Sequence, residues 1–120
     1  MADRVLFISW GEVVRGREAA ALENFNETVG LYGRMQQEGR MESFDVVMLD
    51  PAMDLAGYFE IHGSAEQLTA LKASEDFRQA LFNGSLIVDN LKMVDGYTNE
   101  GIAREMELYQ NAISKVPQSA

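Results

Sequence analysis

The chain has 120 residues and a mass of 13.4 kDa, which is the size of one domain. Its 19 acidic and 10 basic residues give a net charge of −9, which argues against nucleic acid as a partner. The absence of cysteine excludes disulfides, thiolate metal sites and cysteine nucleophiles, and a single histidine excludes metal sites that need two. No apolar run approaches the roughly 18 residues of a membrane span, and no signal peptide is recognisable, so we expect a cytoplasmic protein without a membrane partner.

The first half of the chain predicts a strand, a helix and a hairpin. Residues 5–10 are β-branched and aromatic, which is typical of a central strand covered on both faces. From Arg17 the apolar residues recur at helical spacing, and Gly39 is a suitable C-terminal stop. The members of this stripe are Leu22, Phe25, Val29 and Tyr32. Residues 40–50 and 55–62 then alternate in polarity around a proline-containing turn, which predicts a hairpin.

The second half predicts a helix, a fourth strand and a last helix. Ser64 and Gln67 have the spacing of a capping box, and the apolar stripe that follows has an irregularity near Ser74. This stripe consists of Leu68, Leu71, Phe77 and Leu81. Residues 87–97 predict the fourth strand, and Thr98 or Asn99 can cap the last helix. That helix carries the most regular apolar stripe of the chain, formed by Ile102, Met106, Tyr109 and Ile113.

This order of elements predicts a single α+β domain over residues 1–120. Right-handed crossovers place the strands in one antiparallel four-stranded sheet, with two helices on one face, in the ferredoxin-like βαββαβ arrangement. The core of this domain covers about residues 4–97, and the extra helix covers about residues 99–114. We expect that helix either to cover part of the open sheet face or to reach a partner.

Apolar residues on both faces of three strands predict a dimer. In a monomer the sheet face opposite the helices would expose apolar side chains, and such a patch marks an interface. The opposed sets are Val5 and Phe7 against Leu6 and Ile8, Val46 and Met48 against Val47 and Leu49, and Leu91 and Met93 against Val88 and Val94. Two sheets packed face to face about a two-fold axis would bury both patches.

This combination of element order and two-sided strands resembles the dimeric α/β barrel superfamily of ferredoxin-like proteins. The resemblance covers about residues 4–97 and includes no diagnostic motif. It implies a homodimer with a ligand cavity between the paired sheets. Members of the superfamily include cofactor-free monooxygenases of antibiotic biosynthesis, muconolactone isomerases and haem-degrading enzymes, so the fold by itself selects no reaction.

The candidate catalytic residues are Tyr58, Glu60 and His62, which alternate along one face of the third strand. If Phe59 and Ile61 pack under the helices, these three side chains face the space between the paired sheets. A histidine beside a carboxylate in a confined site is suited to proton transfer near neutral pH. In the alternative interpretation, Glu60 and His62 only pair with each other or across the dimer interface.

Five further residues are candidates for ligand binding. Asp45 on the second strand and Asn90 and Lys92 on the fourth belong to the same predicted face. Arg15 and Arg17 flank a glycine just before the first helix, where free amides and guanidinium groups can hold an anion. The alternative for these two arginines is a solvated basic turn. We predict no metal site and no cofactor, because one imidazole among carboxylates lacks the spacing of a metal site.

Three functions remain open from the sequence. The first is a homodimeric protein that binds a small organic molecule between its sheets. The second is a cofactor-free monooxygenase or isomerase of the dimeric α/β barrel type, which would use His62, Glu60 and Tyr58. The third is a structural or regulatory dimer with no ligand and a closed apolar interior.

Overall fold

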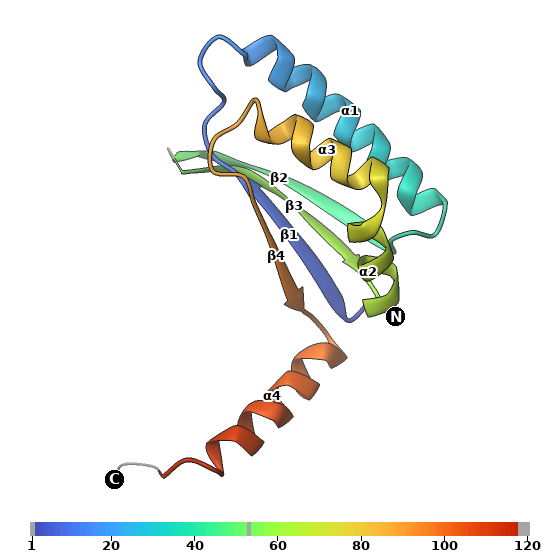
Figure 1. The fold of residues 1–120 in the computed structure, drawn as a ribbon, viewed down its shortest axis with the longest axis vertical. Helices are drawn as coiled ribbons and strands as arrows, with labels where there is room; N and C mark the ends of the chain where they lie inside the picture. The colour runs from blue at the N-terminus through green and yellow to red at the C-terminus, as the bar shows by residue number, and fades with distance from the viewer. Residues whose placement is uncertain (1, 53, 118–120) are drawn as a thin grey trace.

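The computed structural model describes residues 2–52 and 54–117. It shows a four-stranded sheet with helices on one face and a last helix that projects from the body (Figure 1). The elements in chain order are β1 (Arg4–Trp10), α1 (Glu18–Gln37), β2 (Ser43–Ala52), β3 (Leu55–Gly63), α2 (Ala65–Ala73), α3 (Glu75–Ser85), β4 (Lys92–Tyr97) and α4 (Glu100–Ile113). The strands are antiparallel in the order β2-β3-β1-β4, so the α+β arrangement expected from the sequence is confirmed.

The core lies between the sheet and the helices α1, α2 and α3. Tyr32 of α1 is at its centre, with ring centroids 5.0 Å from Phe59 and 6.0 Å from Phe77. The strands contribute Leu6 and Ile61, which are fully buried. Each such side chain contributes about 1.5–3 kcal/mol through removal of apolar area from water. The same burial raises the pKa of the Tyr32 hydroxyl above its ordinary value.

The second predicted helix is two helices, so three helices rather than two cover the sheet. Ser64 caps α2 with the capping box expected from the sequence, since Gln67 N donates to Ser64 Oγ at 3.1 Å and Ser64 N donates to Gln67 Oε1 at 2.8 Å. The helix stops at Ser74, which has extended backbone angles and whose hydroxyl donates to Leu71 O at 2.6 Å. The chain therefore bends at Ser74, and α3 places Phe77 in the core.

The fourth strand is shorter than predicted, because it begins at Lys92 rather than at Ile87. The preceding residues pair with the loop after β1 instead, through hydrogen bonds from Gly11 N to Asp89 O at 2.8 Å and from Val14 N to Ile87 O at 2.9 Å. Asn90 then takes a left-handed conformation with φ of 59°, which interrupts the extended run before β4.

Helix α4 extends away from the rest of the molecule (Figure 1) and does not cover the open face of the sheet. The molecule measures 55 × 36 × 23 Å and has a radius of gyration of 17.1 Å. A compact domain of this length would have a radius of gyration of about 13–14 Å. The apolar stripe of α4 consequently stays exposed in the single chain. Within the described residues, no helix has both the length and the apolar character that a membrane crossing requires.

Candidate functional site

The sheet face opposite the helices forms a regular grid of side chains. Phe59 and Ile61 are 6% and 0% exposed in the core, so Tyr58, Glu60 and His62 lie on the opposite face, as the sequence predicted. Strand register defines three rungs in the order β2, β3, β1, β4, namely Ser43–His62–Val5–Gly96, Asp45–Glu60–Phe7–Val94 and Val47–Tyr58–Ser9–Lys92. The half of this open face on β2 and β3 is mainly polar, and the half on β1 and β4 is mainly apolar.

The polar half brings two carboxylates to one histidine nitrogen. His62 Nε2 lies 3.1 Å from Glu60 Oε1 and 3.6 Å from Asp45 Oδ2. Glu60 is two residues before His62 on β3, and Asp45 pairs with Glu60 across the β2–β3 ladder, so the strand period produces this cluster. The His62 side chain is 21% exposed, and these contacts are ion pairs only when the imidazole is protonated. This arrangement is able to pass a proton between an imidazole and a carboxylate.

An aromatic pair joins the two halves of the open face, with Phe7 on β1 and Tyr58 on β3. The rings of Phe7 and Tyr58 have centroids 4.9 Å apart and an interplanar angle of 38°. Val94 beside Phe7 is exposed, and Gly96 lies close to Val5, since a Cβ at Gly96 would approach Val5 Cγ1 to 2.8 Å. The open face therefore offers an apolar surface next to the His62 cluster.

The other predicted ligand residues do not all reach this face. Lys92 lies on it, two rungs from His62. Asn90 precedes β4 rather than belonging to it, and its Nδ2 donates to Asp54 O at 2.8 Å. Arg15 and Arg17 are exposed in the loop before α1 and belong to none of the three rungs. The amide of Gly16 between them already donates to the Glu18 carboxylate at 3.1 and 3.2 Å.

Among residues 2–52 and 54–117, no group of three histidine, cysteine, aspartate or glutamate side chains is arranged to hold a metal ion.

An apolar pocket lies at the end of β1 and is lined by none of the predicted site residues. Its volume is about 350 Å³. The lining residues are Trp10, Val13, Glu18, Ala21, Leu22, Phe25, Met48 and Val88. The Trp10 indole forms one wall and lies over Gly57, where an added Cβ would come within 2.6 Å of Trp10 Cζ2. The available signal in the sequence was the single tryptophan at the end of the first predicted strand, whereas its pairing with Gly57 is visible only in the structure.

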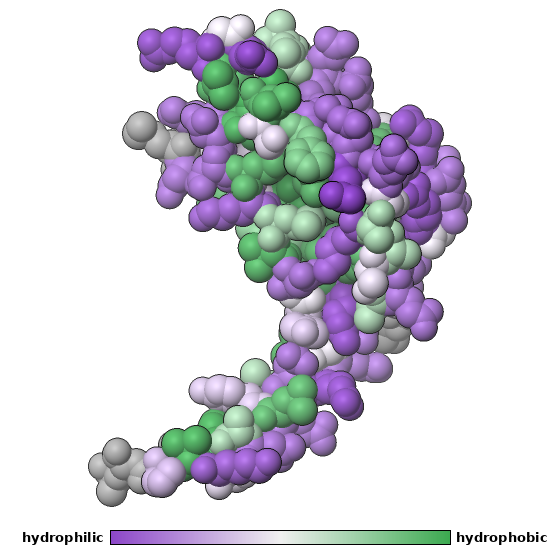
Figure 2. All heavy atoms as spheres, viewed as in Figure 1, coloured by the Kyte–Doolittle hydropathy of each residue, from purple (hydrophilic) through white to green (hydrophobic). Residues whose placement is uncertain are grey.

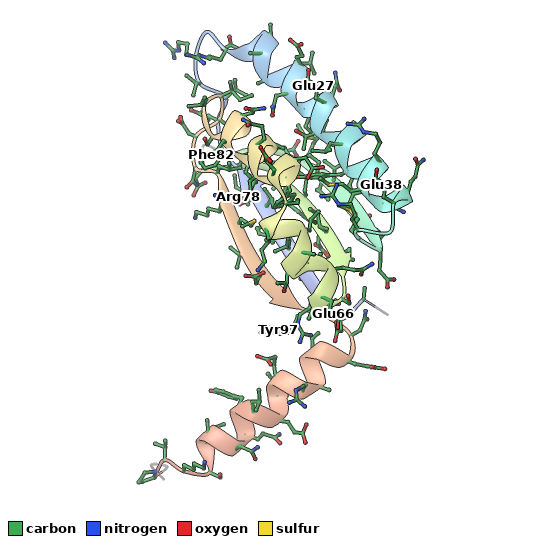
Figure 3. The ribbon with its side chains drawn as sticks, turned by 45° about the vertical axis from the view of Figure 1, so that its right-hand side comes forward. Glu27, Glu38, Glu66, Arg78, Phe82 and Tyr97 are labelled. Atoms are coloured by element: carbon green, nitrogen blue, oxygen red, sulfur yellow. The ribbon has the colours of Figure 1, made fainter. Side chains whose placement is uncertain are left out.

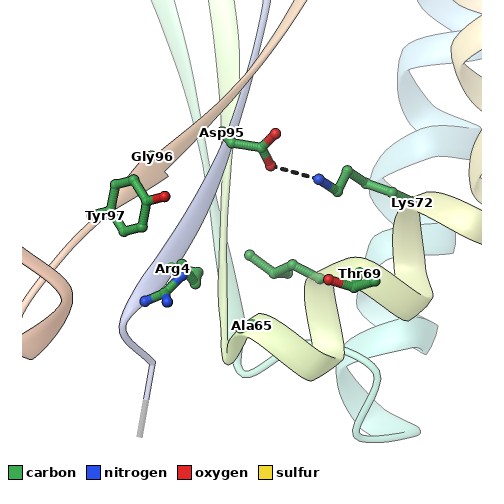
Figure 4. Close-up of a pocket in the computed structure, with 8 residues that line it drawn as sticks. Arg4, Ala65, Thr69, Lys72, Asp95, Gly96 and Tyr97 are labelled. Atoms are coloured by element: carbon green, nitrogen blue, oxygen red, sulfur yellow. Dashed lines mark hydrogen bonds and ion pairs between the residues drawn. The ribbon is translucent and has the colours of Figure 1, made fainter. Parts of the chain in front are cut away.

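A second, more polar pocket of about 250 Å³ lies between β4, β1 and α2 (Figure 4). Lys72 Nζ contacts Asp95 Oδ1 at 2.8 Å across this pocket. The Arg4 guanidinium lies 4.7 Å from the centroid of the Tyr97 ring and pairs with Asp3 at 3.1 Å. Both cations therefore already have carboxylate partners, and these contacts secure the end of β4 from which α4 begins.

Comparisons with known proteins give likeness in structure only. No family model matches the sequence, and no curated protein matches it either. A conserved protein of unknown function from Bacteroides thetaiotaomicron, a possible oxidoreductase, is similar with a TM-score of 0.61 and 17% identity, over 80% of this chain and 98% of that one. A dimeric protein of unknown function and ferredoxin-like fold from Bacteroides fragilis has a TM-score of 0.58 and 9% identity, over 79% and 96% of the two chains. A candidate antibiotic biosynthesis monooxygenase from Chloroflexus aurantiacus has a TM-score of 0.53 and 14% identity, over 80% and 93%.

These similarities establish the fold class of the chain. It is a ferredoxin-like α+β domain, which is the fold that the sequence predicted. Proteins of this fold carry unrelated functions, so the site must supply the functional argument.

Proposed function

We propose that this protein is a homodimer that binds a small aromatic molecule against the open face of its sheet, in a space closed by a second copy. The observation that carries the proposal is the composition of that face, where the Phe7–Tyr58 ring pair adjoins the cluster of His62, Glu60 and Asp45. Ligand sites typically combine an apolar, aromatic surface with a few polar groups that fix orientation.

Two further observations support self-association through this face. None of the helices in the described residues covers this face (Figure 1), and Phe7 and Val94 lie side by side in its apolar half. An exposed apolar surface rimmed by polar residues is typical of an interface. The structurally similar Bacteroides fragilis protein is itself dimeric, which is consistent with this arrangement.

The apolar pocket beside Trp10 is the competing location for a ligand. It lies within one protomer, and its volume of about 350 Å³ is within the usual range for small-molecule sites. Its lining offers a single carboxylate, Glu18, which already accepts hydrogen bonds from Gly16 N. The open face provides more groups that can orient a polar ligand, and we therefore place the ligand there.

The chain contains one histidine and one tryptophan, so one experiment separates the two locations. We would titrate the protein with 1-naphthol and follow the His62 imidazole and Trp10 indole resonances by NMR. Binding at the open face shifts the imidazole resonances and leaves the indole nearly unchanged. A shift of the indole alone would move the ligand to the Trp10 pocket, and no shift of either at millimolar probe would contradict the proposal of an aromatic ligand.

The short His62–Glu60 contact also favours a second candidate, a cofactor-free monooxygenase or isomerase that moves a proton on this face. That function requires the two groups to be coupled. In the Glu60→Gln variant the His62 imidazole resonances, and their response to 1-naphthol, should then differ from those of the parent at the same pH, because the carboxylate 3.1 Å away has been replaced by an amide. If the spectra of the two proteins coincide with and without 1-naphthol, the proton-transfer hypothesis is wrong and only the binding function remains.

A further inference from the structure

Helix α4 presents an apolar surface that its own chain leaves exposed. Ile102, Met106 and Tyr109 lie on one side of the helix and are between 50% and 63% exposed. An isolated helix of 14 residues is marginal in water, because helix nucleation is costly and short helices depend on packing. The stable form of α4 therefore requires another surface for this stripe.

The direction of α4 is fixed by contacts at its first turn. Asn99 Nδ2 donates to Ala2 O at 2.8 Å, and Thr98 N donates to Asp3 O at 3.2 Å. Gly101 is buried against the Asp3 carbonyl, where a Cβ would clash. For α4 to fold back onto its own body, these contacts would have to break. In this orientation the stripe points away from its own body and is open to a neighbouring molecule (Figure 1).

A groove of suitable character lies on the body between α3 and β4. It has a volume of about 300 Å³ and is lined by Lys72, Arg78, Leu81, Phe82, Ser85, Leu91 and Met93. Phe82 and Met93 are exposed, and β4 is an edge strand of the sheet. Figure 2 shows apolar side chains gathered on this side of the body and again along α4, and Figure 3 shows Arg78 and Phe82 on α3 beside β4.

The charges beside the two surfaces are complementary. Glu105 lies three residues after Ile102 and four before Tyr109, so it flanks the stripe of α4. Within the described part of the chain, Arg78 makes no ion pair, whereas Lys72 at the other side of the groove is paired with Asp95. Two copies that each carry a net charge of −9 repel one another, so a cation that meets an acidic helix offsets part of that repulsion.

We propose that α4 of a second copy lies in the groove between α3 and β4, with Glu105 of the second copy facing Arg78. By two-fold symmetry each copy gives its α4 to the other, and the exchange closes as a dimer. The helix is about 21 Å long, and α3, which forms one wall of the groove, spans 11 residues or about 16 Å. The inference rests on the proposed self-association, but it concerns a different surface from the open face.

Charge reversal tests the proposed pair. Arg78→Glu and Glu105→Arg should each raise the dimer dissociation constant by about ten-fold or more, because like charges then face one another. The double variant that carries both Arg78→Glu and Glu105→Arg should recover most of the dimer affinity. Arg104→Glu reverses a charge on the other side of α4 and is the matched control, expected to change affinity much less. Circular dichroism establishes that every variant is folded, and sedimentation velocity gives the dissociation constants.

Crosslinking identifies the occupant of the groove directly, because the chain has no cysteine of its own. Phe82→Cys and Met106→Cys proteins, mixed and treated with a short bismaleimide, should form crosslinked dimers that contain one copy of each. A crosslink within a single chain of the double variant would show that α4 folds back on its own body. Crosslinks only between two Met106→Cys copies would show that α4 pairs with α4. Either result overturns the proposal.

A separate variant distinguishes this inference from the proposed function. Phe7→Lys places a charge on the open face and leaves the groove and α4 unchanged. If the Phe82–Met106 crosslink persists in this variant while naphthol binding is lost, the two proposals hold independently. If the crosslink fails in a parent background that still binds naphthol at His62, the exchange of α4 is wrong and the open-face site remains.

Discussion

Helices α3 and α4 both carry an apolar side, yet they have different environments. Phe77 of α3 is fully buried under the sheet with Tyr32, whereas Met106 of α4 is 51% exposed. The sequence pattern of α4 is the more regular of the two. Periodicity thus indicates that one side of a helix must be covered, but it does not indicate which molecule covers it.

The strongest test of this comparison is a matched pair of substitutions within α3. Phe77→Ala should lower the free energy of unfolding by about 3–5 kcal/mol, because it leaves a cavity in a close-packed core. Phe82→Ala on the same helix removes an equal volume from an exposed position and should leave the stability of the protomer nearly unchanged. Urea unfolding at low protein concentration measures both values. Equal losses would mean that the two sides of α3 have been assigned wrongly.

The next test replaces an apolar residue of α4 by a charge. Met106→Asp should weaken the dimer by about ten-fold or more, because a buried charge in an interface is costly. The fold of the protomer should persist, since Met106 does not belong to its core. Thermal unfolding over a range of protein concentrations measures this effect. A variant with the same concentration dependence as the parent would show that α4 makes no contact in the dimer.

The smallest effect concerns an ion pair that joins the loop after α1 to the start of α3. Arg40 donates to both Asp76 oxygens at 2.7 and 2.8 Å, and these hydrogen bonds hold the pKa of Asp76 below its usual range. Both side chains are partly exposed, so Asp76→Asn should cost only about 1 kcal/mol. The pKa of the Asp76 carboxyl is lower in the folded chain than in the unfolded chain, where it is about 4. The ionised carboxylate therefore stabilises the fold when the pH is above about 4, and this stabilisation is lost as the pH falls below that value. The difference between parent and variant should therefore shrink below about pH 4, and a difference that stays constant to pH 2 would contradict this assignment.

The sequence was sufficient to predict the four-stranded sheet and which residues of β3 lie on each of its two faces. Alternation in β3 correctly separated Phe59 and Ile61 from Tyr58, Glu60 and His62, because one buried face fixes the register of a strand. The capping box at Ser64 correctly marked the start of α2. The alternation in β3 and the capping box at Ser64 both depend on residues that are close together in the chain, so a single sequence is enough to recognise them.

The features that depend on contacts between distant residues were not predicted. The start of β4 was placed too early, because residues 87–91 pair with the loop after β1. The pocket beside Trp10 was missed, because it forms only when α1 and the β1–β3 ladder meet. The direction of α4 depends on hydrogen bonds to the opposite end of the chain, which no periodicity reveals.

We propose that a second copy covers both the open face and the stripe of α4. Sedimentation equilibrium of the purified protein at micromolar concentration should therefore give a mass near twice the 13.4 kDa of the chain. A mass equal to that of one chain under the same conditions would contradict this proposal.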